Sequence, residues 1–129
     1  MVSFLYSYRA LVGGYYSGEK GNGSDSAYIS CRMNGMWQEE SNITPTVGEI
    51  KYHFGNDVAI SGDTDIIGSP HDVDMGLCSG SVYVFFVRNG LIWEEVQKLA
   101  PAYGKASCDF GIILSLSDDT AVIGAYEEN

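Results

Sequence analysis

The sequence predicts an all-β fold made of β-propeller blades of four antiparallel strands, with about two and a half blades present as a partial or open propeller. The first observation is a repeat: Phe54-Gly55 recurs as Phe110-Gly111, and Ile67-Gly68 recurs as Ile123-Gly124, each 56 positions later. The second is that one period holds four β-rich segments and no helical pattern long enough to compete with them. A fixed period of about 50 residues is typical of propellers and solenoids, and four strands per period favour the propeller.

The repeat divides the chain into three copies. The first copy is diverged, but its Trp37 corresponds to Trp93 of the second copy at the same spacing of 56. The third copy is partial, because it contains only two expected strands, which end at Tyr126. We therefore expect one β-propeller segment over 1–129, with repeat 1 at 1–53, repeat 2 at 54–109 and partial repeat 3 at 110–129.

The first copy contains four β-rich segments in order. Asn34-Gly35 supplies the two residues with positive φ that a tight hairpin turn needs between the third and fourth strands. The expected strands are Val2–Tyr6, Tyr8–Tyr15, Ser26–Met33 and Trp37–Ile43.

The second copy repeats this order. A short apolar run ends at Gly62-Asp63, which offers a tight turn before the β-rich run resumes. A segment dense in β-branched and aromatic residues then reaches the turn pair Asn89-Gly90. The third copy begins in the same way, around Asp118-Asp119. The strands expected in the second copy are Asp57–Ser61, Asp65–Ile67, Ser81–Arg88 and Leu91–Lys98.

The connections between strands alternate in length. The turns within hairpins are minimal, whereas Pro70–Gly80 and Leu99–Asp109 are long. In an up-and-down blade, the connection from strand two to three and the connection to the next blade lie at the same end, so all the long loops share one face. Loops held on a rigid scaffold carry recognition more often than the scaffold does. The long-loop face is therefore the predicted binding surface.

The charge balance argues against several classes of partner. With 17 acidic and 7 basic side chains, the net charge of −10 repels phosphate backbones, so we expect no nucleic-acid partner. The longest apolar stretch, Val82–Val87, is far shorter than the ~20 residues of a membrane helix, so we expect no membrane insertion. Met1–Ser7 lacks the basic start and apolar centre of a secretory leader, so we expect no signal peptide in this chain.

The cysteines and histidines indicate neither a metal centre nor an active site. Cys31, Cys78 and Cys108 include no Cys-x-x-Cys pair, so we expect neither a disulfide framework nor a zinc site, and a pairing of Cys78 with Cys108 stays open. His53 and His71 are the only histidines, and neither lies in a recognisable catalytic motif. We therefore expect no enzyme activity, no catalytic residues and no cofactor.

These motifs together resemble FG-GAP repeats, the units of the integrin α-subunit propeller. The resemblance rests on Phe-Gly at the start of a strand, on Gly68-Ser69-Pro70 and Gly124-Ala125-Tyr126 at the end of the second strand, and on Ser-Gly-Ser-Val-Tyr-Val-Phe over Ser79–Phe85. It covers nearly the whole chain and is most specific over Phe54–Lys98. It implies a propeller in an extracellular or cell-surface protein, with a role in binding or cell adhesion.

The sequence departs from the integrin-type repeat between the first two strands. Integrin-type repeats often carry an Asp-x-Asp/Asn-x-Asp-Gly-x-x-Asp calcium loop there, whereas this chain has only Gly62-Asp63 or Asp118-Asp119. Calcium needs six to eight oxygen ligands, and so short a turn cannot wrap an ion. We therefore expect the short, calcium-free variant of the repeat.

Five residues of the long-loop face are candidate ligand-binding positions. Tyr16 and Tyr103 lie in loops rather than in strands, where their rings are free to stack on a sugar. Asp72 and Asp74 alternate beside His71 and are weak candidates for a cation held by carboxylates, although a solvated acidic loop is the simpler interpretation.

These features favour a non-catalytic propeller segment that recognises a protein or glycan ligand. The main alternative is a purely structural role, in which the blades space or close a larger protein, and part of a hydrolase is a third hypothesis. Two and a half blades cannot form a ring without help. We therefore expect further blades in a parent chain, or homo-oligomerisation, to close it.

Overall fold

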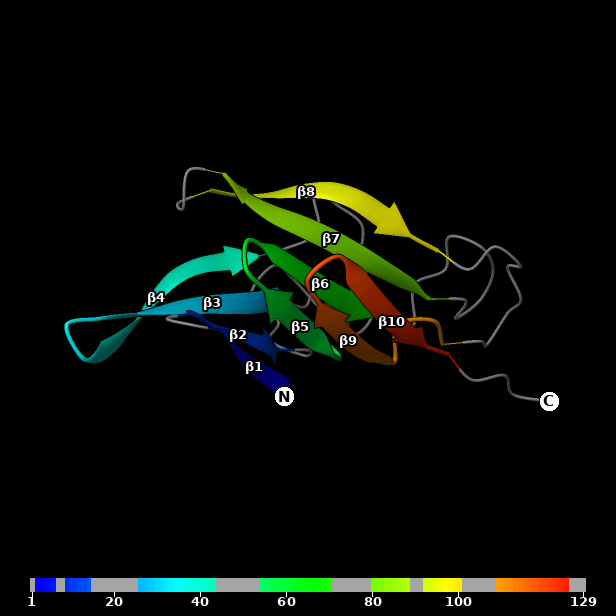
Figure 1. Ribbon diagram of the computed structural model, residues 1–129. Helices are drawn as coiled ribbons and strands as arrows, with labels where there is room; N and C mark the ends of the chain where they lie inside the picture. The colour runs from blue at the N-terminus through cyan, green and yellow to red at the C-terminus, as the bar shows by residue number, and fades with distance from the viewer. Residues whose placement is uncertain are drawn as a thin grey trace.

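The computed structural model describes residues 2–6, 9–14, 26–43, 54–70, 80–88, 92–100 and 109–125. Within these ranges every regular element is a β-strand, and the strands form three antiparallel sheets (Figure 1). The two four-stranded sheets are meanders and the third is a hairpin, because the strands of each are hydrogen-bonded in sequence order. The expected all-β fold of partial propeller blades is confirmed.

The first sheet contains a tight turn that the sequence predicts. The turn at Asn34-Gly35 is confirmed, because its two residues have positive φ angles of 54° and 77°. Asn and Gly adopt this left-handed region at little cost. The register between the third and fourth strands shifts between Ile29 and Ser30, which marks a β-bulge. The strands are β1 (Val2–Tyr6), β2 (Arg9–Gly14), β3 (Ser26–Met33) and β4 (Met36–Ile43).

The second and third sheets repeat this pattern. The second sheet consists of β5 (Val58–Ser61), β6 (Thr64–Ser69), β7 (Ser81–Arg88) and β8 (Ile92–Leu99), and the third consists of β9 (Ile113–Ser117) and β10 (Thr120–Gly124). β6 extends the β-rich run Asp65–Ile67 by Thr64 at its start and by Gly68 and Ser69 at its end, where the family resemblance places the close of this strand. The β7–β8 register shifts between Val84 and Phe85, which correspond to Ile29 and Ser30. Even the bulge is therefore repeated. The predicted turn at Asn89-Gly90 lies outside the described residues.

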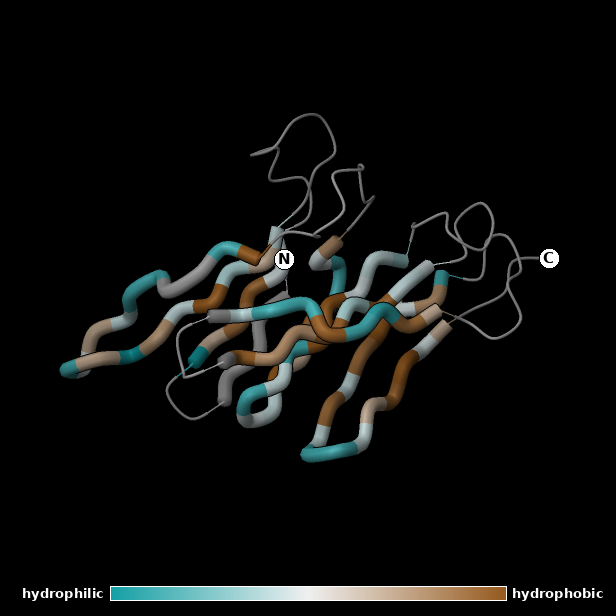
Figure 2. The backbone as a smooth tube through the Cα atoms, turned by 90° about the horizontal axis from the view of Figure 1, so that it is seen from above, coloured by the Kyte–Doolittle hydropathy of each residue, from teal (hydrophilic) through white to brown (hydrophobic). Residues whose placement is uncertain are grey.

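The sheets stack one on another, with their first strands side by side. β1 lies beside β5, and β5 lies beside β9, whereas β4 and β8 lie on the outside (Figure 1). Figure 2 shows the three sheets in a row from above, with hydrophobic positions concentrated in the strands of the middle sheet and the last hairpin. Blades of a propeller stack in this way around a central axis.

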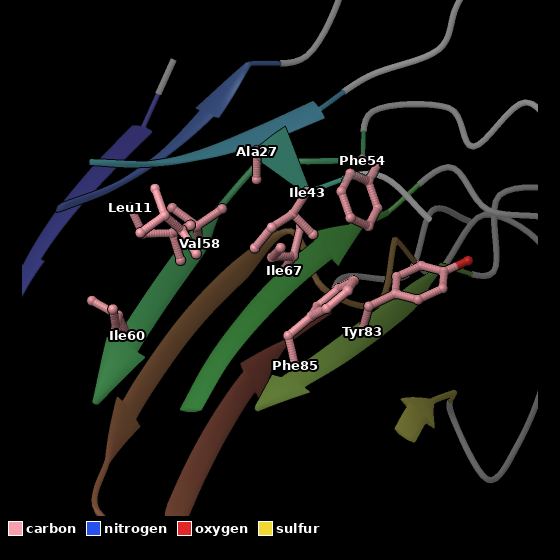
Figure 3. Packing of buried hydrophobic residues seen from close by; sticks show 10 residues of the cluster. Leu11, Ala27, Ile43, Phe54, Val58, Ile60, Ile67, Tyr83 and Phe85 are labelled. Atoms are coloured by element: carbon pink, nitrogen blue, oxygen red, sulfur yellow. The ribbon is translucent and has the colours of Figure 1, made fainter. Parts of the chain in front are cut away.

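The first core cluster lies between the first and second sheets, and we call this contact the first junction (Figure 3). The Phe54 ring meets the rings of Tyr83 and Phe85 edge-on, with centroid separations of 5.3 Å and 6.4 Å. Such pairs stabilise more than their buried area alone. The first sheet contributes Leu11, Ala27, Ile29 and Ile43, and the second contributes Phe54, Val58, Ile60, Ile67, Tyr83 and Phe85, with Trp93 packed against them.

The second core cluster lies between the second and third sheets and uses the same repeat positions; we call it the second junction. Ile66, Val82, Val84 and Leu99 correspond to Leu11, Ala27, Ile29 and Ile43, and Phe110, Leu114, Leu116 and Ile123 correspond to Phe54, Val58, Ile60 and Ile67. The two junctions therefore have equivalent apolar surfaces on both sides.

Glycines allow the backbones to approach at each junction. A Cβ on Gly13 would lie 2.0 Å from the carbonyl oxygen of Gly55, and a Cβ on Gly68 would lie 2.1 Å from that of Gly111. No side chain fits at such distances. The Phe-Gly glycines also donate their N–H groups within their own sheets, from Gly55 to the carbonyl of Gly68 and from Gly111 to that of Gly124, both at 3.0 Å. The Phe-Gly motif thus links each blade to the preceding one.

Candidate functional site

The strand pairings define one end of the stack, which we call the loop end. Gly14 at the end of β2 pairs with Ser26 at the start of β3, and Ser69 pairs with Ser81 in the same way in the second sheet. The last residues of β4 and β8 also lie at this end, because Ile43 pairs with Ala27 and Leu99 pairs with Val82, near the starts of β3 and β7. The connections 15–25, 44–53, 70–80 and 100–109 therefore leave from and return to the loop end.

Several residues of the described loop end are buried or held by backbone contacts. Ser69 and Ser81 are fully buried. Gly80 forms a parallel bridge with Phe110 across the second junction. Asp109 is also buried, has a positive φ of 47°, and accepts a hydrogen bond at its carbonyl from the N–H of Ile112 at 3.1 Å. These contacts hold the strand ends firmly, as a scaffold for binding loops requires.

The predicted ligand-binding positions fall on the connections and not on the described strands. Tyr16, His71, Asp72, Asp74 and Tyr103 all lie outside the described residues, as do His53, Cys78 and Cys108. Their contacts therefore stay predictions. Cys31 lies on β3, where it is a half-buried free thiol.

The opposite end of the stack, the turn end, carries short hairpin turns as predicted. Ser61 pairs with Thr64 across Gly62-Asp63, and Ser117 pairs with Thr120 across Asp118-Asp119. Each turn therefore has two residues, which is too few to supply the six to eight oxygen ligands of calcium. Across the described ranges, no group of three or more His, Cys, Asp or Glu residues could hold a metal ion.

Three side chains in β5 or just before it form hydrogen bonds with backbone groups of the third sheet and so stabilise the second junction. The Asp57 carboxylate accepts a hydrogen bond from the N–H of Leu114 at 2.7 Å, and the Asn56 amide donates to the carbonyl of Ile112 at 3.3 Å. The Ser61 hydroxyl accepts from the N–H of Asp118 at 3.1 Å. These polar bonds fix the register of the two inner strands, in addition to the apolar packing.

Sequence reasoning missed a charged cluster in the first junction. The Arg9 guanidinium on β2 lies 5.6 Å from the centroid of the Trp93 ring, and its Nη1 lies 3.8 Å from Oδ1 of Asp63. Asp65 is fully buried and pairs with Ile60 and Phe85, which belong to the first junction, so its side chain faces the same way. Arg9 therefore brings a positive charge to the face on which Asp65 is buried.

The repeat itself contains the signal that could have found this cluster. Arg9 stands where the other two copies have Thr64 and Thr120, and Asp65 stands where they have Ala10 and Ala121. These two residues, which differ from their equivalents in the other copies, have opposite charges and occupy adjacent positions of the repeat. Because β2 and β6 belong to neighbouring blades that pack together, Arg9 and Asp65 both lie at the first junction.

Replacing Arg9 by threonine, the residue of the other two copies, should lower the free energy of unfolding by about 1 kcal/mol, because a guanidinium–indole contact is lost. The loss should be smaller by about 0.5 kcal/mol or more when Asp65 is already alanine, because the buried carboxylate is then absent. Urea denaturation of both single variants and the double variant measures the coupling. Additive losses would show that Arg9 does not stabilise Asp65.

Comparisons with known proteins agree with this geometry. The family model described as FG-GAP repeat matches residues 37–85 and 93–129, which together span most of the second copy, the outer strand of the first and the whole third copy. A search of curated proteins found no match. Among the residues with a described structure, no helix is long and apolar enough to cross a membrane. The matched residues cover well over half of the chain, and the chain therefore belongs to the FG-GAP repeat family.

Proposed function

We propose that this chain is a non-catalytic propeller segment of a surface or secreted protein, and that its loop end binds a protein or glycan ligand. The observation that carries the proposal is the pairing of the strand ends, from which the connections 15–25, 44–53, 70–80 and 100–109 all depart at one end. Recognition residues concentrate on loops that a rigid scaffold holds. FG-GAP repeats typically occur in extracellular or surface proteins, which supports the proposed setting.

The residues of these connections support a particular kind of ligand. Tyr16 and Tyr103 offer flat rings for stacking on a sugar or packing on an apolar side chain. His71, Asp72 and Asp74 add hydrogen-bonding groups and negative charge, in a chain of net charge −10. An anionic ligand would be repelled, so neutral or basic ligands are favoured. FG-GAP repeats are generally non-catalytic, which supports binding without turnover.

An array of glycans and proteins tests this proposal. We expect the 129-residue chain to bind a discrete set of neutral or basic ligands. Substituting alanine for both Tyr16 and Tyr103 should lower that binding by roughly tenfold, because aromatic side chains dominate recognition surfaces. Asp119→Ala is the control, since Asp119 is exposed in the β9–β10 turn at the opposite end. Absence of binding to every ligand, or an equal loss in the control, would contradict the proposal.

A further inference from the structure

The β9–β10 hairpin has one covered face and one exposed face. Leu114, Leu116 and Ile123 pack against the second sheet. On the other side, Ile113 is 66% exposed and Val122 is 65% exposed. Alternate residues of a strand point to opposite faces, and Val122 pairs with Ser115 while Gly124 pairs with Ile113. We call Ile113, Ser115, Val122 and Gly124 the open face; Figure 2 shows this hairpin at the end of the row of sheets.

The corresponding face is covered in both other copies. Val122 corresponds to Leu11 and Ile66, which are 0% and 1% exposed. The second sheet covers Leu11 in the first junction, and the β9–β10 hairpin covers Ile66 in the second. In each case the covering element is the blade that follows. Val122 is the apolar residue at this position of the third copy, and it therefore indicates that the hairpin offers a surface to a further blade.

Gly124 provides a second, independent observation. It corresponds to Gly13 and Gly68, at which a Cβ would lie 2.0 Å and 2.1 Å from the carbonyl oxygen of the next Phe-Gly. At Gly124 the nearest atom to such a Cβ is Cβ of Ile113, in the same hairpin, at 3.3 Å. Its φ is not positive either. Within the described part of the chain, no neighbouring backbone comes close enough to Gly124 to require glycine there. The carbonyl of a further Phe-Gly, placed as at Gly13 and Gly68, would require it.

We propose that the open face of the β9–β10 hairpin is a docking surface for a further FG-GAP blade, which covers Val122 and places its Phe-Gly carbonyl against Gly124. The occupant must offer a free Phe-Gly at the start of its first strand. A folded second copy of this chain does not, because Phe54-Gly55 and Phe110-Gly111 are both packed in its own junctions. The established geometry of the two junctions thus defines the partner of the third.

The third copy also specifies what the incoming strand meets. The positions of Asn56 and Asp57, which bond to the backbone across the second junction, are Ile112 and Ile113 in the third copy. Ser117 keeps the position of Ser61, whose hydroxyl accepts an N–H from the next hairpin turn. The incoming blade is therefore expected to carry an apolar side chain opposite Ile113 and a tight turn with a free N–H opposite Ser117.

Cysteine labelling of an extended chain tests this proposal. In that chain, residues 70–129 are repeated after Ala125, so that the third blade is completed and a further Phe-Gly hairpin follows it. Val122→Cys is introduced in the original hairpin of both the natural and the extended chain, and mass spectrometry measures the alkylation rate of that site. We expect fast labelling in the natural chain and labelling slower by roughly tenfold or more in the extended chain, because docking buries the thiol.

Two controls separate docking on the face from other effects. Changing the appended Phe110-Gly111 to Asp-Val should restore fast labelling while leaving the strand pairing of β10 intact. Gly124→Val should lower the unfolding midpoint of the extended chain and leave that of the natural chain nearly unchanged. Equal labelling rates in both chains, or equal effects of Gly124→Val, would overturn the proposal. The proposal would also be overturned if the natural chain formed an oligomer in which the thiol is labelled slowly and which Val122→Asp dissociates. In that case a second copy of the chain would cover the open face.

Discussion

Replacing Ile66 by aspartate should lower the free energy of unfolding by about 4 kcal/mol or more, because apolar burial is lost and a carboxylate enters an apolar site. Ile66 is 1% exposed and packs with Ala59, Val82 and Leu114 in the second junction. The described members of that cluster are all apolar, so none offers the carboxylate a hydrogen bond. We expect the β9–β10 hairpin to detach from the second sheet even where the first junction stays folded.

Urea denaturation measures this loss, and amide hydrogen exchange locates it. Protection should disappear over 113–124 before it disappears in the first sheet. Val122→Asp is the matched control, because Val122 occupies the same repeat position but is 65% exposed. An exposed substitution of this kind should change stability by only about 0.5 kcal/mol. Similar losses for the two variants would show that Ile66 does not hold the junction.

Replacing Gly68 by alanine should lower the free energy of unfolding by about 3 kcal/mol, because overpacking against backbone cannot be relieved by a side-chain rotation. The new Cβ would lie 2.1 Å from the carbonyl oxygen of Gly111 and 3.4 Å from that of Asp57. To make room, Gly111 must move away from β6. That movement also strains the 3.0 Å hydrogen bond from the N–H of Gly111 to the carbonyl of Gly124.

Thermal and urea unfolding of Gly68→Ala check this expectation beside Gly124→Ala. At Gly124 the added Cβ meets Cβ of the exposed Ile113 at 3.3 Å, and a small shift of that side chain relieves the contact. The control variant should therefore lose no more than about 1 kcal/mol. If Gly68→Ala were as stable as the natural chain, the sheets would be further apart at the junction than the structure indicates.

Much of each blade could be predicted because the rules that form it are local. Asn34-Gly35 has positive φ at both residues, a conformation that these two residue types favour locally, and the strands on either side then pair across this turn. The repeat helps further, because a segment whose own residues do not define its structure can be assigned from the equivalent segments of the other copies. At β6 the β-rich run Asp65–Ile67 is shorter than the strand, because glycine has low β propensity, and only the family resemblance places Gly68 and Ser69 at the strand end, where they pair with β7.

The candidate site could be predicted less well. The end from which the long connections depart follows from strand order alone, and the strand pairings agree with it. The five residues proposed for ligand contact lie on those connections, outside the described residues, so their arrangement remains a prediction. The cluster at Arg9 was missed because its members come from β2, the β5–β6 turn and β8, which only the stacking of two blades brings together.

The sequence by itself determined the period of 56, the four-strand meander, the short turns and the positions of Phe-Gly, because hydrophobic alternation and turn chemistry act over a few residues. The tertiary structure decided which equivalent residues differ in their surroundings. Ile66 and Val122 share a repeat position and a similar side chain, yet one is buried and the other exposed. The physical reason is that burial depends on whether another blade is stacked on that face, and stacking joins inner strands that lie more than 40 residues apart in the chain, such as β5 and β9.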